Sequence, residues 1–142
     1  MDSYRFLEHT ADAGVEIDAS NPVEVYRLGL QALTDCITEL GKVEARQQER
    51  FSLRGGGFDV LLVDWLQELL FRFETTGFLA RDAELRLTED NDGDVTLEGV
   101  VLGEPFDPAR HPLKLPVKAV TYHRLVFEPT DDGYFARVIF DV

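Results

Sequence analysis

The sequence Ala-Arg-Val-Ile-Phe-Asp-Val, residues 136–142, predicts a buried β-strand that stops at an acidic residue. Side chains of a strand alternate between its faces, so the apolar residues at the even positions share one face and Asp141 lies on the other. The α-carboxylate of Val142 adds a second negative group beside Asp141. Two oxygen donors at one strand tip suit a divalent cation such as Ca²⁺, Mg²⁺ or Mn²⁺. A third ligand must come from elsewhere in the chain.

The third ligand is predicted near the start of the chain, in the loop from His9 to Asp12 between the expected strands 4–9 and 14–19. If these strands neighbour the C-terminal strand, Asp12 meets Asp141 and the Val142 carboxylate. Three clustered carboxylates repel one another, so they need a cation. The alternative is that Asp12 only caps its own loop through backbone amides. By default, His9 and His123 are structural histidines.

Two amphipathic helices are predicted between the strands. Asn21 or Ser20 caps the first, which runs from Pro22 to about Glu39 with Gly41 as its terminator. The glycines 55–57 lack the lysine and hydroxyl residue of a phosphate loop, so they predict a turn into the second helix, from 58 to about 75. This helix is apolar on two sides, which predicts that it is covered on two sides.

Further strands are predicted at 50–53, 84–88, 95–101, 117–127 and 134–142, with an extended surface loop at 105–116. The coarse order is ββαβαβββ, with room for one extra strand. Strands that outnumber two amphipathic helices predict an α+β fold with the helices packed on a largely antiparallel β-sheet. A chain of 142 residues is expected to form one domain, residues 1–142.

The composition restricts the function. With 14 basic and 27 acidic residues, the net charge of −13 disfavours direct binding to nucleic acid and suits a partner with a basic surface. The same acidity is also explained by solubility alone. The single cysteine, Cys36, excludes an internal disulfide and a multi-cysteine zinc site, and is predicted to be a buried structural thiol. Neither a secretion signal nor a membrane-spanning run is evident, so a cytosolic protein is expected.

Two further charged residues interrupt apolar patterns. Lys118 shares a predicted strand face with Val120 and Tyr122, and it either extends to the sheet edge or contacts an anion or a partner's carboxylate. Asp64 falls within an apolar stripe of the second helix, as a partly buried acid with a partner or at the solvent-exposed edge. No serine, cysteine or threonine has a histidine at motif spacing, so the residues indicate no reaction of their own.

Four stretches stand out by their order and spacing: Phe-Leu-Glu-His-Thr-Ala-Asp at 6–12, Leu-Leu-Val-Asp-Trp-Leu-Gln-Glu-Leu-Leu at 61–70, Lys-Ala-Val-Thr-Tyr-His at 118–123, and Arg-Val-Ile-Phe-Asp-Val at 137–142. Together they resemble the archease family over essentially the whole chain. The resemblance implies a small non-enzymatic protein that activates the RtcB-type, GTP-dependent RNA ligase in tRNA splicing or RNA repair. The family's role is to promote guanylylation of the ligase and multiple turnover.

The resemblance also implies roles for individual residues. It maps the metal ligands onto Asp12, Asp141 and Val142, and a functionally important lysine onto Lys118. Asp12, Lys118 and Asp141 would then be required for activation of the ligase, with His9, His123 and Asp64 in supporting positions. The alternative function associated with the family is that of a general protein chaperone or a modulator of an RNA methyltransferase.

Overall fold

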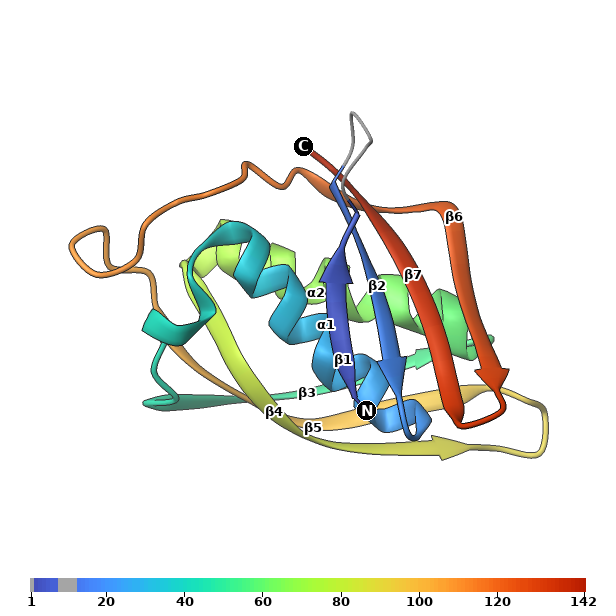
Figure 1. Ribbon diagram of the computed structural model, residues 1–142. Coiled ribbons are helices and arrows are strands. Elements are labelled where there is room, and N and C mark those ends of the chain that lie inside the picture. Colours follow the sequence, from blue (N-terminus) through green and yellow to red (C-terminus); the bar gives the residue numbers. More distant parts are fainter. Residues whose placement is uncertain (1, 8–12) are drawn as a thin grey trace.

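The computed structural model describes residues 2–7 and 13–142, and the statements below concern these residues. They form helices and strands in the predicted order, with the extra strand present (Figure 1). A short 3₁₀ turn, Leu40–Lys42, follows the first helix. The elements are β1 (Ser3–Phe6), β2 (Ala13–Ala19), α1 (Pro22–Ile37), β3 (Gln47–Gly55), α2 (Phe58–Thr76), β4 (Phe78–Glu89), β5 (Val95–Pro105), β6 (Ala119–Thr130) and β7 (Gly133–Asp141).

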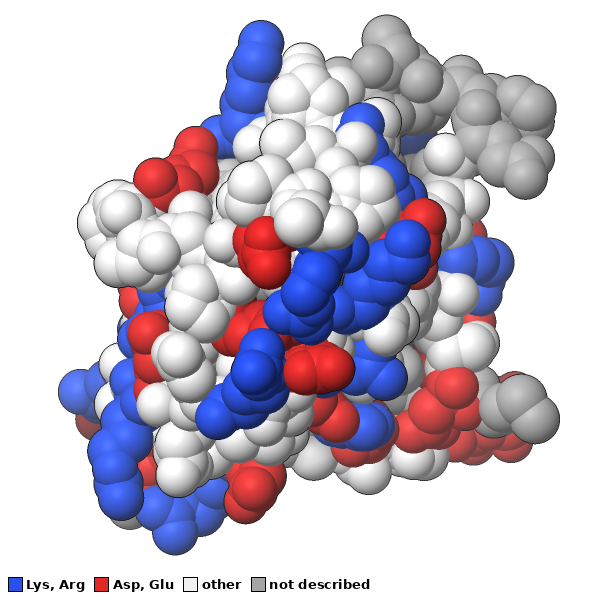
Figure 2. All heavy atoms as spheres, turned by 90° about the vertical axis from the view of Figure 1, so that its left-hand side faces the viewer, with Lys and Arg blue, Asp and Glu red and all other residues white. Residues whose placement is uncertain are grey.

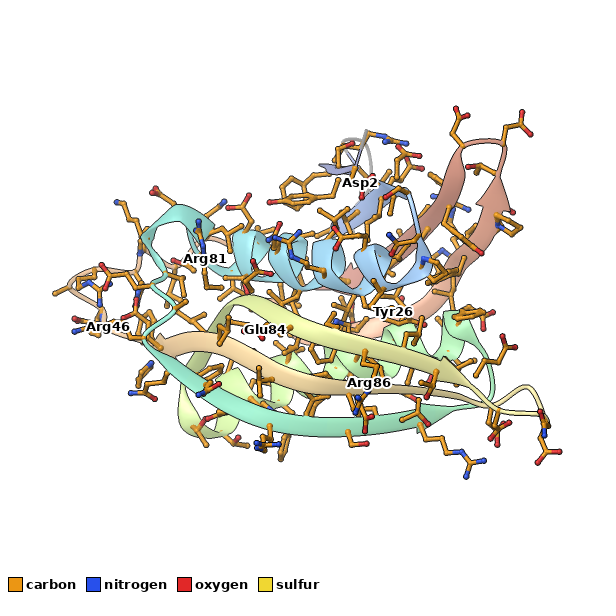
Figure 3. All side chains as sticks on the ribbon, turned by 90° about the horizontal axis from the view of Figure 1, so that it is seen from below. Asp2, Tyr26, Arg46, Arg81, Glu84 and Arg86 are labelled. Atoms are coloured by element: carbon orange, nitrogen blue, oxygen red, sulfur yellow. The ribbon has the colours of Figure 1, made fainter. Side chains whose placement is uncertain are left out.

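The strands form two antiparallel sheets rather than one. The first sheet has the order β1-β2-β7-β6 and the second has the order β3-β5-β4. Both helices lie between the sheets: α1 packs on β2 and β4, and α2 packs on β6 and β3. In Figure 3, seen from below, the second sheet crosses the lower half of the view in front of α2, and α1 runs between this sheet and the strands of the first sheet. The predicted α+β class is confirmed, and the division into two sheets explains why both helices are apolar on more than one side.

Helix α1 begins where the sequence predicts. The side-chain Oδ1 of Asn21 accepts a hydrogen bond from the backbone N–H of Glu24 at 3.1 Å, as an N-cap does. The predicted end at Glu39 with Gly41 as terminator is wrong. The helix stops at Ile37, and the carboxylate of Asp35 accepts the N–H of Leu40 at 3.1 Å and turns the chain back early. Cys36 is buried as predicted, and burial raises its pKa to about 12.

Helix α2 also has the predicted limits, because Gly77 takes a left-handed conformation with φ 78° directly after Thr76. The side chain of Trp65 is fully buried, and its Nε1 donates to the carbonyl oxygen of Tyr26 at 2.9 Å, which ties α2 to α1. The prediction that this helix is covered on two sides is confirmed by its packing on both sheets. No helix of the described residues is long and apolar enough to span a membrane.

Candidate functional site

The C-terminal end of β7 lies in the middle of its sheet, between the start of β2 and the start of β6. Ala13 of β2 pairs with Phe140, and Ala119 of β6 pairs with Asp141. The backbone N–H of Lys118 donates to the carbonyl oxygen of Asp141 at 2.7 Å. We call Lys118, Asp141 and Val142 the strand tip. The pairing therefore brings together two of the site residues that the sequence predicts far apart in the chain.

Burial along β7 follows the predicted alternation except at Ile139. Phe140 is fully buried, Asp141 is exposed and Val142 is half-buried. Ile139 lies on the same strand face as Asp141 but is also buried, because it packs beside Leu7 where Gly14 leaves room. A Cβ at Gly14 would lie 2.7 Å from Leu7 Cδ1 and 2.8 Å from Ile139 Cδ1. Leu7 and Ile139 therefore form an apolar pair on the outer face, between Asp141 and the ion-paired side chains of Arg5, Glu16 and Arg137.

The Asp141 carboxylate is available for a ligand. Within residues 2–7 and 13–142, no lysine, arginine or histidine lies within ion-pair distance of it. No group of three potential metal-ligating side chains occurs in the same part of the chain. Asp12 and His9 lie outside the described residues, so the three-carboxylate site stays a prediction. The donors that are described, an exposed carboxylate and the adjacent Val142, suit a hard divalent cation.

Lys118 lies just before β6, and its side chain is exposed. The prediction that Lys118 shares one strand face with Val120 and Tyr122 is wrong, because Val120 is buried whereas Tyr122 is 59 % exposed. Strand pairing is interrupted between them: Thr121 pairs with Ile139, and the next paired residue of β6 is Val126. Residues 122–125 therefore form a bulge on the edge of the sheet, opposite Val138 of β7.

Hydrogen bonds hold the bulge in one conformation. The hydroxyl of Thr121 accepts from the N–H of His123 at 3.2 Å, and Arg137 Nε donates to the carbonyl oxygen of Arg124 at 3.0 Å. Arg124 has a left-handed φ of 55°, which is uncommon for a residue with a side chain. The side chain of His123 is exposed, so the prediction of a structural core histidine is wrong for it. It projects from the same sheet edge as Tyr122.

Asp64 lies on the outer side of α2 and is half-buried. Its carboxylate has no ion-pair partner among the described residues. The sequence left two positions open for Asp64, a partly buried acid with a partner or an acid at the solvent-exposed edge of the helix. The structure supports the second.

A buried acid-base cluster, absent from the sequence predictions, lies under the segment 105–116. Glu104 is only 2 % exposed, and its carboxylate accepts from Arg110 Nη2 at 2.8 Å, from His111 Nε2 at 3.0 Å and from the N–H of Glu44 at 2.8 Å. The hydrogen bonds from Arg110 are the main cause that holds the pKa of Glu104 well below its usual range.

Both ring nitrogens of His111 have hydrogen-bond partners within this cluster. Its Nδ1 accepts the backbone N–H of Asp107 at 2.8 Å, so its proton lies on Nε2, which donates to Glu104. The expectation of an extended surface loop at 105–116 is confirmed for most of its residues, which are exposed, but His111 is almost fully buried. No spacing in the sequence marks Glu104 and His111 as a pair. The cluster anchors the segment that leads to Lys118.

Comparison with known proteins covers nearly the whole chain. The model of the Archease protein family matches residues 4–142. The protein archease of Methanopyrus kandleri is 39 % identical over 136 residues, which cover 96 % of each chain. That of Sulfurisphaera tokodaii is 30 % identical and covers 100 % of each chain.

Solved structures agree with the sequence comparison. The solution structure of protein 1598 of Methanobacterium thermoautotrophicum has a TM-score of 0.81 at 30 % identity, over 99 % of each chain. The crystal structure of an archease from Thermotoga maritima, described as a possible chaperone, has a TM-score of 0.63 at 18 % identity and shares the fold. Sequence and fold agree over the full length, and the chain belongs to the archease family.

Proposed function

We propose that this protein is a non-enzymatic activator of an RtcB-type, GTP-dependent RNA ligase in tRNA splicing or RNA repair. It would promote guanylylation of the ligase and multiple turnover. The observation that carries the proposal is the exposed carboxylate of Asp141 at the end of a central strand, beside Lys118. Membership of the archease family supports the same role.

The tip fits a divalent cation bound by Asp12, Asp141 and Val142. Asp12 lies outside the described residues, and the residue after it in the sequence, Ala13, pairs with Phe140 of β7. Ca²⁺, Mg²⁺ and Mn²⁺ all accept such oxygen donors. When bound, the cation would supply positive charge toward phosphate oxygens of a nucleotide in the ligase.

Other residues would assist from nearby positions. Lys118 offers a positive charge beside the carboxylates, suited to a phosphate or a carboxylate of the ligase. His123 lies in the adjacent bulge, and Asp64 lies on the neighbouring helix. The net charge of −13 speeds encounter with a basic enzyme that binds RNA, because opposite charges steer association.

The test is multiple-turnover ligation of a 3′-phosphate RNA to a 5′-hydroxyl RNA by the cognate ligase, with GTP, Mn²⁺ and substoichiometric protein. We expect wild-type protein to stimulate, and Asp12→Ala, Lys118→Ala and Asp141→Ala to lose stimulation. Asp132→Ala is the matched control, since Asp132 is an exposed acid in the turn at the opposite end of β7. Full stimulation by Asp141→Ala would contradict the proposal.

A second candidate function is a general protein chaperone. The exposed apolar side chains of Phe71 and Leu113 favour it, because a chaperone binds apolar surfaces of its clients. Suppression of aggregation of several unrelated proteins, with no dependence on Asp141, would support this function. Stimulation confined to one ligase and lost in Asp141→Ala would exclude it as the explanation.

A further inference from the structure

The exposed large apolar side chains of the described residues gather on one side of the molecule. Apart from Phe6 in β1, they come from α2, from the segment 113–118 and from the start of β6. We call them the apolar face, which consists of Val60, Phe71, Leu113, Leu115 and Tyr122. Phe71 is 57 % exposed and Leu113 is 65 % exposed. A cluster of this kind indicates an interaction surface, whereas single exposed apolar residues do not.

The members of the apolar face lie on adjacent elements. On α2, positions 60, 64, 67, 71 and 74 recur at helical spacing and form one stripe along the outer side of the helix. The side chain of Gln67 in this stripe accepts the backbone N–H of Val120 at 3.1 Å, which joins the stripe to β6 two residues before Tyr122. Phe73 and Glu74 at the end of α2 line a groove with the segment 113–118.

The groove is a surface hollow of about 400 Å³ with a mainly apolar lining that includes Ile37, Phe73 and Leu115. Its wall is held in place by the end of α1. The N–H of Lys114 donates to the carbonyl oxygen of Ile37 at 2.8 Å, and the N–H of Leu115 donates to that of Cys36 at 3.1 Å. These bonds satisfy carbonyl groups that a helix end leaves unpaired, so the exposed leucines sit on a fixed backbone.

The segment 113–118 carries two lysines, Lys114 and Lys118, beside its exposed leucines. Figure 1 shows the segment crossing the upper left of the molecule, and Figure 2 shows that side with an uncharged area above a band of alternating basic and acidic side chains. Lys114 beside the groove already contacts Asp35 at 3.6 Å. An apolar hollow with charges at its border has the layout of a protein interface.

The charges near the apolar face select the chemistry of its partner. Asp64 and Glu74 lie within the α2 stripe, and the whole chain carries a net charge of −13. Lys114 and Lys118 also line the groove, and Lys114 is paired with Asp35. The acidic side chains of the stripe and the net charge favour a partner whose apolar side chains are flanked by lysine and arginine. An amphipathic helix that enters an apolar groove is a common arrangement for such contacts.

We propose that the apolar face is the docking surface for a basic amphipathic helix of the RNA ligase, whose apolar side chains enter the groove between α2 and the segment 113–118. This inference rests on the proposed function, since it names the surface through which the same partner is held. Docking and activation are then separate: the apolar face sets the affinity for the ligase, and the strand tip sets the maximum stimulation.

The experiment measures two quantities for each variant: the Kd for the cognate ligase by fluorescence anisotropy, and ligation rate as a function of protein concentration. We expect Phe71→Ser and Leu115→Ser each to raise the Kd and the half-maximal concentration about tenfold, because exposed anchors of this kind dominate interface energies. Maximum stimulation at saturation should stay at the wild-type value. Asp141→Ala should show the reverse, a wild-type Kd with lost stimulation.

Phe6→Ser is the matched control, because Phe6 is 41 % exposed but lies on β1 at the opposite edge of the first sheet from β6. Thermal unfolding of every variant shows whether the fold is kept, and Leu113→Ser replaces any variant that unfolds, since Leu113 is the most exposed of the set.

Three results would overturn the inference: an unchanged Kd in the apolar-face variants, no binding of wild-type protein to the ligase, or a wild-type dimer that Phe71→Ser converts to monomer. The last would make the face an interface between two copies.

If wild-type protein binds but does not stimulate, the proposed function fails, while a raised Kd in Phe71→Ser still supports the docking surface. If stimulation depends on Asp141 but no apolar-face variant raises the Kd, only the docking surface fails.

Discussion

Lys118 and Asp141 are joined through the backbone, with the N–H of Lys118 donating to the carbonyl oxygen of Asp141 at 2.7 Å. The bond leaves both side chains exposed at the same strand tip. A cationic and an anionic side chain thus share one end of the first sheet although their charges do not form an ion pair with each other. Both side chains are exposed and can contact a ligand or a partner protein.

Adding one glycine after Val142 should weaken binding of Mn²⁺ at the strand tip by at least about tenfold. The added residue moves the terminal carboxylate away from Asp141 and removes one predicted ligand. Isothermal titration calorimetry on the metal-free protein measures the change. Val142→Leu keeps the terminal carboxylate and should bind Mn²⁺ as the unaltered protein does. Equal affinity in the extended variant would show that Val142 is not a ligand.

Glu104→Gln should lower the free energy of unfolding by about 3 kcal/mol, because it leaves Arg110 next to an uncharged, buried partner. Urea denaturation measures the loss. Glu84→Gln is the control: Glu84 is exposed on the second sheet (Figure 3), and its replacement should change stability by less than about 0.5 kcal/mol. A loss below 1 kcal/mol in Glu104→Gln would mean that the cluster contributes little to stability.

The stabilisation from Glu104 should depend on pH in one direction. Its pKa is lowered in the folded protein, mainly by hydrogen bonds from Arg110, so the unfolded chain binds the proton more readily. The contribution is therefore complete above the unfolded value of about 4.3, and is lost as the pH falls below it toward the lowered folded value. Urea denaturation between about pH 6 and pH 2 should show the difference between wild type and Glu104→Gln shrinking with acid. A difference in unfolding free energy that stays constant over this pH range would contradict the prediction.

Gly99→Ala should destabilise the second sheet by roughly 2–4 kcal/mol. Gly99 has φ 151°, and an added Cβ would lie 1.9 Å from the carbonyl oxygen of Glu84 on the neighbouring strand. Gly41→Ala is the matched control, because no atom lies within 4 Å of the corresponding position. Thermal unfolding of the two variants compares them directly, and similar melting temperatures would mean that β4 can move to accept the methyl group.

Several features of the fold were predictable because they depend on residues close together in the chain. The start of α1 at Asn21, the end of α2 at Gly77 and the exposed Asp141 after a buried strand all follow from local hydrogen bonding and alternation. The class of fold followed from the number and order of such elements. The early end of α1 was missed because it depends on a side-chain bond from Asp35 that no propensity indicates.

The site required the tertiary structure wherever it depends on distant partners. The sequence by itself determined that Asp141 ends an apolar strand and that Lys118 begins another, since both properties are local. Only the tertiary structure decided that β7 lies between β2 and β6, that pairing breaks after Thr121, and that Glu104 is buried against His111. Strand order, register shifts and buried pairs arise from packing between residues far apart in sequence, and local patterns carry no record of that packing.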